Sequence, residues 1–168
     1  PVGVVFHYAL GAELDEEVVI SLQVFEERGA DPIWTWTRKP ASTDEEESPG
    51  PDDPPDTRVL SSDAGLNRYV WDMRYPGMER FDKLIMWADM RQGPKAVPGS
   101  YRAKLTVGDV EQDVDFEIVT DPRSTSSNAD YRAQFEFISE TRDLLSRTHV
   151  EIRKVRQLRT QLDGLKVR

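Results

Sequence analysis

Few side chains in this sequence are of the types that perform chemistry. The chain of 168 residues contains no cysteine, which excludes disulfides, thiolate nucleophiles and cysteine-bound metals. Its two histidines are His7, in a strand-like run, and His149, beside the apolar stripe of a helix-like run. No motif ties either histidine to a serine or to a pair of carboxylates, so we expect both to be structural.

Acidic side chains are plentiful, but they lie in solvated runs or on the outer face of the last hairpin. Residues 40–57 hold seven acids and five prolines, with a single alanine as the only apolar residue. Asp52, Asp53 and Asp56 could form a cation site, yet the prolines and the absence of a spaced calcium-loop pattern favour a flexible surface loop. No paired carboxylates, phosphate loop, zinc spacing or nucleophile elbow is recognisable. We therefore predict no enzyme activity, no metal and no cofactor.

Two tryptophans provide the one pattern that suggests a ligand. Trp34 and Trp36 alternate in a short strand and share one face, as a sugar-stacking platform requires. The same spacing fits two core or interface residues, and large aromatic side chains are mostly buried. The core interpretation is favoured, and carbohydrate binding is kept as the alternative.

One stretch organises the strands. Over residues 65–76, Asn67, Tyr69 and Trp71 point to one side of an alternating run, which is typical of a half-buried strand. Residues 4–10 and 18–25 are expected to form an antiparallel pair, and 33–37 and 58–61 to be short strands. The clearest hairpin joins 101–107 to 114–118, apolar inside and charged outside. About seven strands with regular turns predict an antiparallel β-sandwich over residues 1–120.

The period changes after a connector at 121–127. Ser127 and Asp130 form a capping-box-like start, and no proline or glycine follows until Gly164. We predict one long amphipathic helix over 128–168. It is longer than a sandwich is wide, so part of its apolar stripe needs another partner, and we expect a homodimer. The residues assigned to the dimer are Ile138, Leu145, Ile152, Val155, Leu158, Leu162 and Leu165.

Charge is divided unevenly along the chain. Of the net −9, residues 1–127 carry −12 (13 basic, 25 acidic) and residues 128–168 carry +3 (9 basic, 6 acidic). Because residues 1–127 are strongly acidic, they should repel nucleic acid and anionic membranes, and we expect neither as a partner. No run approaches the roughly 18 apolar residues of a membrane span. The chain opens in mid-pattern and ends in a helix, so we expect a piece of something longer.

A set of short motifs supports a resemblance. It comprises Gly65-Leu66-Asn67-Arg68-Tyr69-Val70-Trp71-Asp72-Met73-Arg74-Tyr75-Pro76, Gly93-Pro94, Val97-Pro98-Gly99-Ser100-Tyr101, Asp121-Pro122-Arg123 and the opening Gly3-Val4-Val5-Phe6-His7-Tyr8. Together they resemble the region that follows the β-propeller in bacterial sortilin-like proteins with BNR-type repeats. The pattern N-x-Y-x-W-D followed by P-G-x-Y is also similar to the immunoglobulin/fibronectin-like domain of the flagellar hook-capping protein.

The resemblance implies an immunoglobulin- or fibronectin-III-like sandwich with a helical extension. Such a region is an accessory part of a secreted, periplasmic or envelope protein, beside a propeller that this chain does not contain. Ser61-Ser62-Asp63-Ala64-Gly65 matches the opening of a propeller Asp-box, but Asn67-Arg68 replace its Thr-Trp and it occurs once. The resemblance carries over no catalytic residues. We expect a non-catalytic module for domain packing, self-association or protein interaction.

Overall fold

The structure is a computed structural model that describes residues 3–15, 17–27, 29–38, 59–81, 84–85 and 92–166. Its contacts divide the chain into two compact units. The sandwich unit comprises Pro1–Met73 and Gly99–Val119, and the helical unit comprises Arg74–Pro98 and Thr120–Arg168. Antiparallel sheets followed by one long C-terminal helix confirm the predicted fold class.

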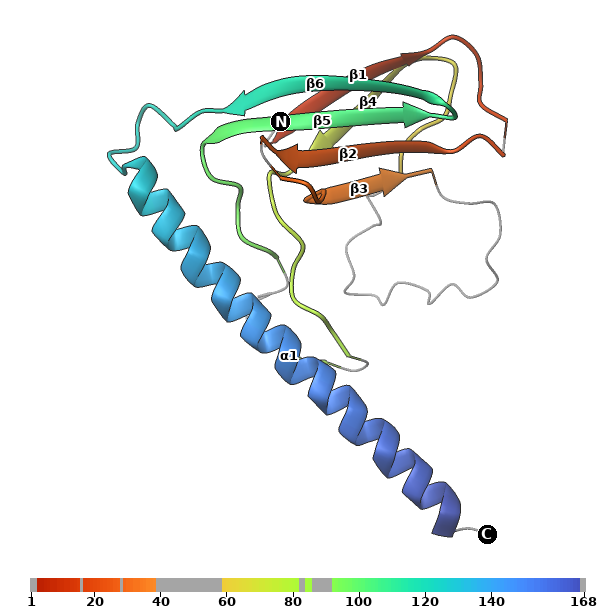
Figure 1. The fold of residues 1–168 in the computed structure, drawn as a ribbon, viewed down its shortest axis with the longest axis vertical. Helices are drawn as coiled ribbons and strands as arrows, with labels where there is room; N and C mark the ends of the chain where they lie inside the picture. Colours follow the sequence, from red (N-terminus) through yellow and green to blue (C-terminus); the bar gives the residue numbers. More distant parts are fainter. Residues whose placement is uncertain are drawn as a thin grey trace. The chain divides into compact units, whose positions relative to one another are not determined.

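The sandwich unit consists of two antiparallel sheets (Figure 1). Strands β1 (Val4–Leu10) and β4 (Gly65–Trp71) form the smaller sheet. The larger sheet has the order β3-β2-β5-β6. Its strands are β2 (Ile20–Glu26), β3 (Trp34–Thr37), β5 (Gly99–Val107) and β6 (Val110–Ile118).

The core lies between the two sheets and is mostly aromatic. Trp71, on β4, is 2% exposed, and its ring centroid lies 6.1 Å from that of Tyr101 and 6.5 Å from those of Trp36 and Phe116. The buried residues of β4 are Asn67, Tyr69 and Trp71, the row that the sequence predicted to share one face. Alternate residues of a strand point to opposite sides, so this row faces the aromatic core. A central tryptophan fills the space between sheets as a sandwich requires.

The expected pairing of the first two strands is wrong. Strand β1 pairs with β4, from Val4 opposite Trp71 to Leu10 opposite Gly65, whereas β2 pairs with β3 and β5. The connection over residues 11–19 is too long for a tight hairpin. It takes the chain to the other sheet, which lets the apolar rows of both strands point into one core.

The pairing of the last hairpin is confirmed, with extended bounds, but its inward row is incomplete because Val114 is 57% exposed. Strands β5 and β6 pair from Gly99 opposite Ile118 to Val107 opposite Val110, and Gly108 adopts a φ of 56° in the turn. A positive φ suits glycine because it has no Cβ. Of the strand expected over 58–61, residue 58 lies outside the described residues, and 59–61 form one bridge, between Thr37 and Val59.

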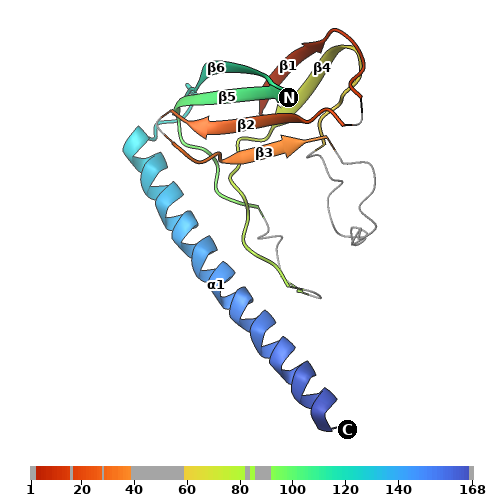
Figure 2. The same cartoon turned by 45° about the vertical axis from the view of Figure 1, so that its right-hand side comes forward.

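The helical unit consists of helix α1 (Asn128–Lys166) and the described parts of 74–98, hereafter the arm. The arm returns on itself through a bridge between Arg74 and Lys95 and a hydrogen bond from Tyr75 N to Pro94 O (2.9 Å). Gly93 makes this turn-back possible, since a Cβ there would lie 2.0 Å from the Tyr75 carbonyl oxygen. Both views show the described arm as irregular chain next to a straight, continuous helix (Figure 2).

The unit boundary differs from the one drawn from the sequence. Residues 74–98 fall within the predicted sandwich range of 1–120, but their contacts group them with α1. The sequence pattern of 77–93 has no clean period, so it gave no sign of that helix contact. The acidic loop assigned to 40–57 lies outside the described residues.

Candidate functional site

Helix α1 begins at a reciprocal cap. The Ser127 N–H and Oγ donate to Asp130 Oδ2 at 2.8 and 2.7 Å, and the Asp130 N–H donates to Ser127 Oγ at 3.2 Å. These bonds lower the pKa of Asp130, the Ser127 hydroxyl most and the Ser127 backbone next. The cap predicted from the sequence is confirmed, with aspartate in the place that glutamate more often takes.

One side of α1 holds the arm through polar side chains. Seven residues share this face, which we call the arm-holding stripe, at spacings of three or four: Tyr131, Phe135, Ser139, Arg142, Ser146, His149 and Arg153. Five of them contact the arm directly: Phe135, Arg142, Ser146, His149 and Arg153. The spacing keeps them on one face of a helix. All seven are buried or half-buried.

Glu79 of the arm is the centre of this contact. Its N–H donates to Ser146 Oγ (3.0 Å), its carbonyl oxygen lies 2.6 Å from His149 Nδ1, and its carboxylate pairs with Arg153 (3.0 Å). A carbonyl can only accept, so Nδ1 of His149 carries the proton in this bond. Side chains of α1 thus satisfy both backbone groups of Glu79, which lies in irregular chain and has no strand or helix partner for them.

Aromatic rings extend the contact on both sides of Glu79. Tyr75 packs on Phe135 with ring centroids 4.8 Å apart, and Phe81 packs edge-on to His149 at 5.1 Å. The guanidinium of Arg156 lies 4.5 Å above the Phe81 ring, a cation–π geometry. The arm therefore follows α1 toward its C-terminus from Tyr75 to Phe81.

His149 has the structural role expected from the sequence, while the same expectation for His7 stays a prediction. His149 is 6% exposed and fastens the arm, whereas His7 is exposed on β1 opposite Arg68. The other residues of the arm-holding stripe were missed by sequence reasoning. Their spacing was a usable signal, but the polar types Ser139, Arg142 and Ser146 made that face look solvated.

A second row of large apolar side chains on α1 is exposed. This row, which we call the 4–3 row, alternates between spacings of four and three along the helix. Its members are Phe137, Thr141, Leu144, Thr148, Glu151, Val155, Leu158, Leu162 and Leu165. Its Phe, Val and Leu side chains are between 58% and 71% exposed. This spacing is the repeat by which helices pair in coiled coils.

The residues assigned to a dimer from the sequence divide into two groups. Val155, Leu158, Leu162 and Leu165 belong to the exposed 4–3 row. Ile138, Leu145 and Ile152 lie seven residues apart, on the flank between that row and the arm-holding stripe. Ile138 is 38% exposed, while Leu145 and Ile152 are half-buried.

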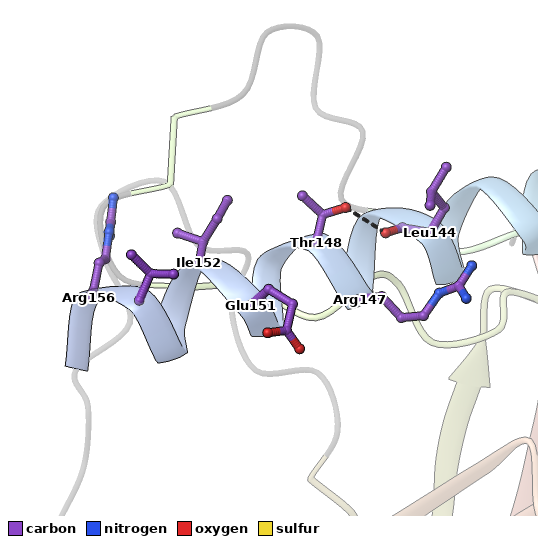
Figure 3. A pocket seen from close by; sticks show the side chains of 7 residues that line it. Leu144, Arg147, Thr148, Glu151, Ile152 and Arg156 are labelled. Carbon is purple, nitrogen blue, oxygen red and sulfur yellow. Dashed lines mark hydrogen bonds between the residues drawn. The ribbon is translucent and has the colours of Figure 1, made fainter. Parts of the chain in front are cut away.

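The middle of the 4–3 row borders a shallow, open hollow of about 730 Å³ (Figure 3). Leu144, Ile152 and Val155 supply its apolar lining, and Arg147, Glu151 and Arg156 supply its charges. The Thr148 hydroxyl donates to the Leu144 carbonyl oxygen at 2.9 Å within the helix, so it presents its methyl group outward from that bond. With its apolar lining and charged rim, the hollow could accept apolar side chains of a partner.

The two tryptophans do not form a platform. Trp36 is 3% exposed and packs against Tyr69 at 4.9 Å, while Trp34 is half-buried and stacks on Trp36 at 6.0 Å. A sugar could reach only Trp34, because the second indole belongs to the core. A stacking platform needs an exposed flat face, so these positions do not provide one between them.

The described residues contain no group of three or more His, Asp or Glu arranged to hold a metal ion. Shifted pKa values among them have local causes. Burial raises the pKa of Tyr8, whose hydroxyl donates to the Ser61 carbonyl oxygen at 2.7 Å. Hydrogen bonds from Arg123 lower the pKa of Asp121, which forms part of the connector before α1. Each shift comes from immediate neighbours, and neither group lines the hollow on α1.

No family model, curated protein or solved structure matches this chain. In the described part of the chain, no helix is both long and apolar enough to cross a bilayer. A function for this chain therefore has to be inferred from its own side chains.

Proposed function

We propose that this chain is a non-catalytic interaction module that self-associates through helix α1. The sandwich is an immunoglobulin- or fibronectin-III-like accessory domain, which in a longer secreted or envelope protein packs beside a β-propeller. The sequence resemblance supports the propeller neighbour and the location. The exposed 4–3 row supports the self-association.

The observation that carries the proposal is the mismatch between the two sides of α1. The described part of the arm occupies the polar side, and the apolar side chains from Leu144 to Leu165 that belong to the 4–3 row remain 58–68% exposed. A helix of 39 residues, about 58 Å long, gains little from intrinsic propensity and is stabilised mainly by packing an apolar face. Large exposed apolar patches mark interaction sites.

A second copy of the chain fits this face by charge. Residues 128–147 carry −1 (3 basic, 4 acidic), and residues 148–168 carry +4 (6 basic, 2 acidic). A parallel pair places two basic halves side by side, whereas an antiparallel pair places each basic half beside the other copy's weakly acidic half. The charge distribution therefore favours an antiparallel homodimer.

The test replaces two exposed residues of the 4–3 row, Val155→Asp with Leu158→Asp. We expect the parent to have a dimer mass by light scattering at tens of micromolar, and the variant to have a monomer mass with its helix retained. The matched control is Gln157→Asp with Thr160→Asp, which adds the same charge at the same spacing on another side of the helix. The control should remain dimeric. A parent that is monomeric at this concentration contradicts the proposal.

A further inference from the structure

The 4–3 row contains polar residues near its middle. Thr148 and Glu151 occupy consecutive positions of the row, with apolar residues at Leu144 before them and Val155 after them. Glu151 is exposed and pairs with Lys154 on the same helix at 2.8 Å. A carboxylate in the middle of a helix interface has to meet a polar partner, because an unpaired buried charge is costly.

We propose that Thr148 and Glu151 set the register of an antiparallel α1 pair, with Thr148 of each copy opposite Glu151 of the other. This inference rests on the self-association proposed above and specifies how the two helices align. In an antiparallel pair with this register, opposite residue numbers sum to 299. On pairing, the Thr148 hydroxyl exchanges its bond to the Leu144 carbonyl oxygen for a stronger one to the facing carboxylate, and the same polar contact forms twice about the two-fold axis.

The same register pairs the apolar residues of the row. Leu144 lies opposite Val155 of the second copy, Thr141 opposite Leu158, and Phe137 opposite Leu162. With the Thr148–Glu151 pair these make four pairings. Each joins a residue of one heptad set of the row (137, 144, 151, 158) to a residue of the other (141, 148, 155, 162), as antiparallel knobs-into-holes packing requires. The row is therefore complementary to itself over residues 137–162.

Neighbouring registers are poorer by the same criteria. A shift of one heptad toward the C-terminus places Glu151 opposite Val155 of the second copy, which leaves the carboxylate against an apolar side chain. A shift of one heptad toward the N-terminus places Leu158 opposite Gln134 and Leu162 opposite Asp130, so both lose the partners they have in the proposed register. In coiled coils, a polar residue within an apolar interface can fix the register, although it lowers stability.

Thiol crosslinking tests the direction and the register together. The parent has no cysteine, so introduced thiols are the only ones present. Leu144→Cys and Val155→Cys are prepared as two separate full-length variants, and each is oxidised alone and in an equimolar mixture. The covalent dimer is expected only in the mixture, because identical positions in an antiparallel pair are about 16 Å apart along the axis at 1.5 Å per residue.

Three results overturn the proposal. Covalent dimer from either variant alone indicates a parallel pair. Crosslinking of Leu144→Cys to Leu162→Cys in preference to Val155→Cys indicates the shifted antiparallel register. If the parent is dimeric and shows either of these crosslinking patterns, the proposed alignment of the helices is wrong but self-association stands. If the parent is monomeric, the self-association itself is wrong.

A second variant tests whether the polar residues cause the register. Thr148→Leu with Glu151→Leu makes the middle of the row uniformly apolar, so the two antiparallel registers become closer in free energy. In that background we expect crosslinking of Leu144→Cys to Leu162→Cys to appear beside the crosslink to Val155→Cys. If the crosslinking pattern is unchanged, Thr148 and Glu151 do not set the register.

Discussion

The sandwich core and helix α1 both have regular apolar patterns, but only the sandwich buries its pattern. On β4, alternate residues point inward, and Trp71 at their end is 2% exposed. On α1, the regular 4–3 row is exposed, and the buried face is the polar stripe that holds Glu79. An apolar pattern thus identifies side chains that need a partner. Whether the chain supplies that partner depends on topology, which local pattern does not encode.

The largest expected effect tests the buried side of this comparison. Trp71→Ala removes a ring in contact with the rings of Trp36, Tyr101 and Phe116. We expect a loss of about 3–5 kcal/mol in the free energy of unfolding, a large share of the stability of a small domain. Urea denaturation followed by circular dichroism measures it.

The control for Trp71→Ala comes from the same strand. Leu66, at the start of β4, is 76% exposed, so Leu66→Ala should change the free energy of unfolding by less than about 0.5 kcal/mol. If Trp71→Ala leaves no folded protein, Trp71→Phe gives a smaller, measurable loss. Equal effects of the Trp71 and Leu66 substitutions would show that the core does not depend on the inward row.

The difference between the two regions also explains what the sequence could predict. The inward rows of β4 and β5, the last hairpin and the Ser127 cap follow from local periods and turn chemistry, and the structure has them. The pairing of β1 with β4 did not follow, because strand partners are chosen by the closed core rather than by sequence neighbours.

The arm contact was beyond local pattern for a related reason. Residues 77–93 have no clean period, and their anchors on α1 are serine, histidine and arginine, types that usually mark a solvated face. Their role depends on Glu79, which lies 67 residues before Ser146 and 70 before His149. Only the three-dimensional structure brings these side chains together.

A medium effect tests the polar side of α1. His149→Ala removes the donor to the Glu79 carbonyl oxygen and the edge-on contact with Phe81. The bond to the Glu79 carbonyl is part-buried and contributes about 0.5–1.5 kcal/mol, so we expect local opening of the arm rather than loss of the sandwich. Hydrogen exchange by mass spectrometry should show faster exchange over residues 76–81.

The control for His149→Ala is its neighbour on the exposed side. Thr148→Ala removes a hydroxyl bonded only within the helix and improves helix propensity, so exchange in the arm should not change. Exchange over 76–81 that is unaffected by His149→Ala would mean that Ser146 and Arg153 hold the arm without it.

The smallest expected effect concerns the start of α1 and depends on pH. The Ser127 bonds hold the pKa of Asp130 below its ordinary value of 3.8, so the charged form is favoured in the folded helix. A depressed pKa contributes stability that is fully present above the unfolded value and is lost as pH falls through the folded value. The first turn of α1 should therefore be ordered at pH 5 to 7 and fray below about pH 4.

The measurement is the protection of the Asp130 amide, which donates to Ser127 Oγ, followed by NMR as the pH is lowered. Asp130→Asn keeps an acceptor but has no charge to lose, so its protection should be lower at pH 7 and independent of pH over this range. Glu136→Gln, an exposed carboxylate outside the cap, should retain the parent's pH dependence. Fraying of the Asp130→Asn variant at the same pH as the parent would assign the transition to another group.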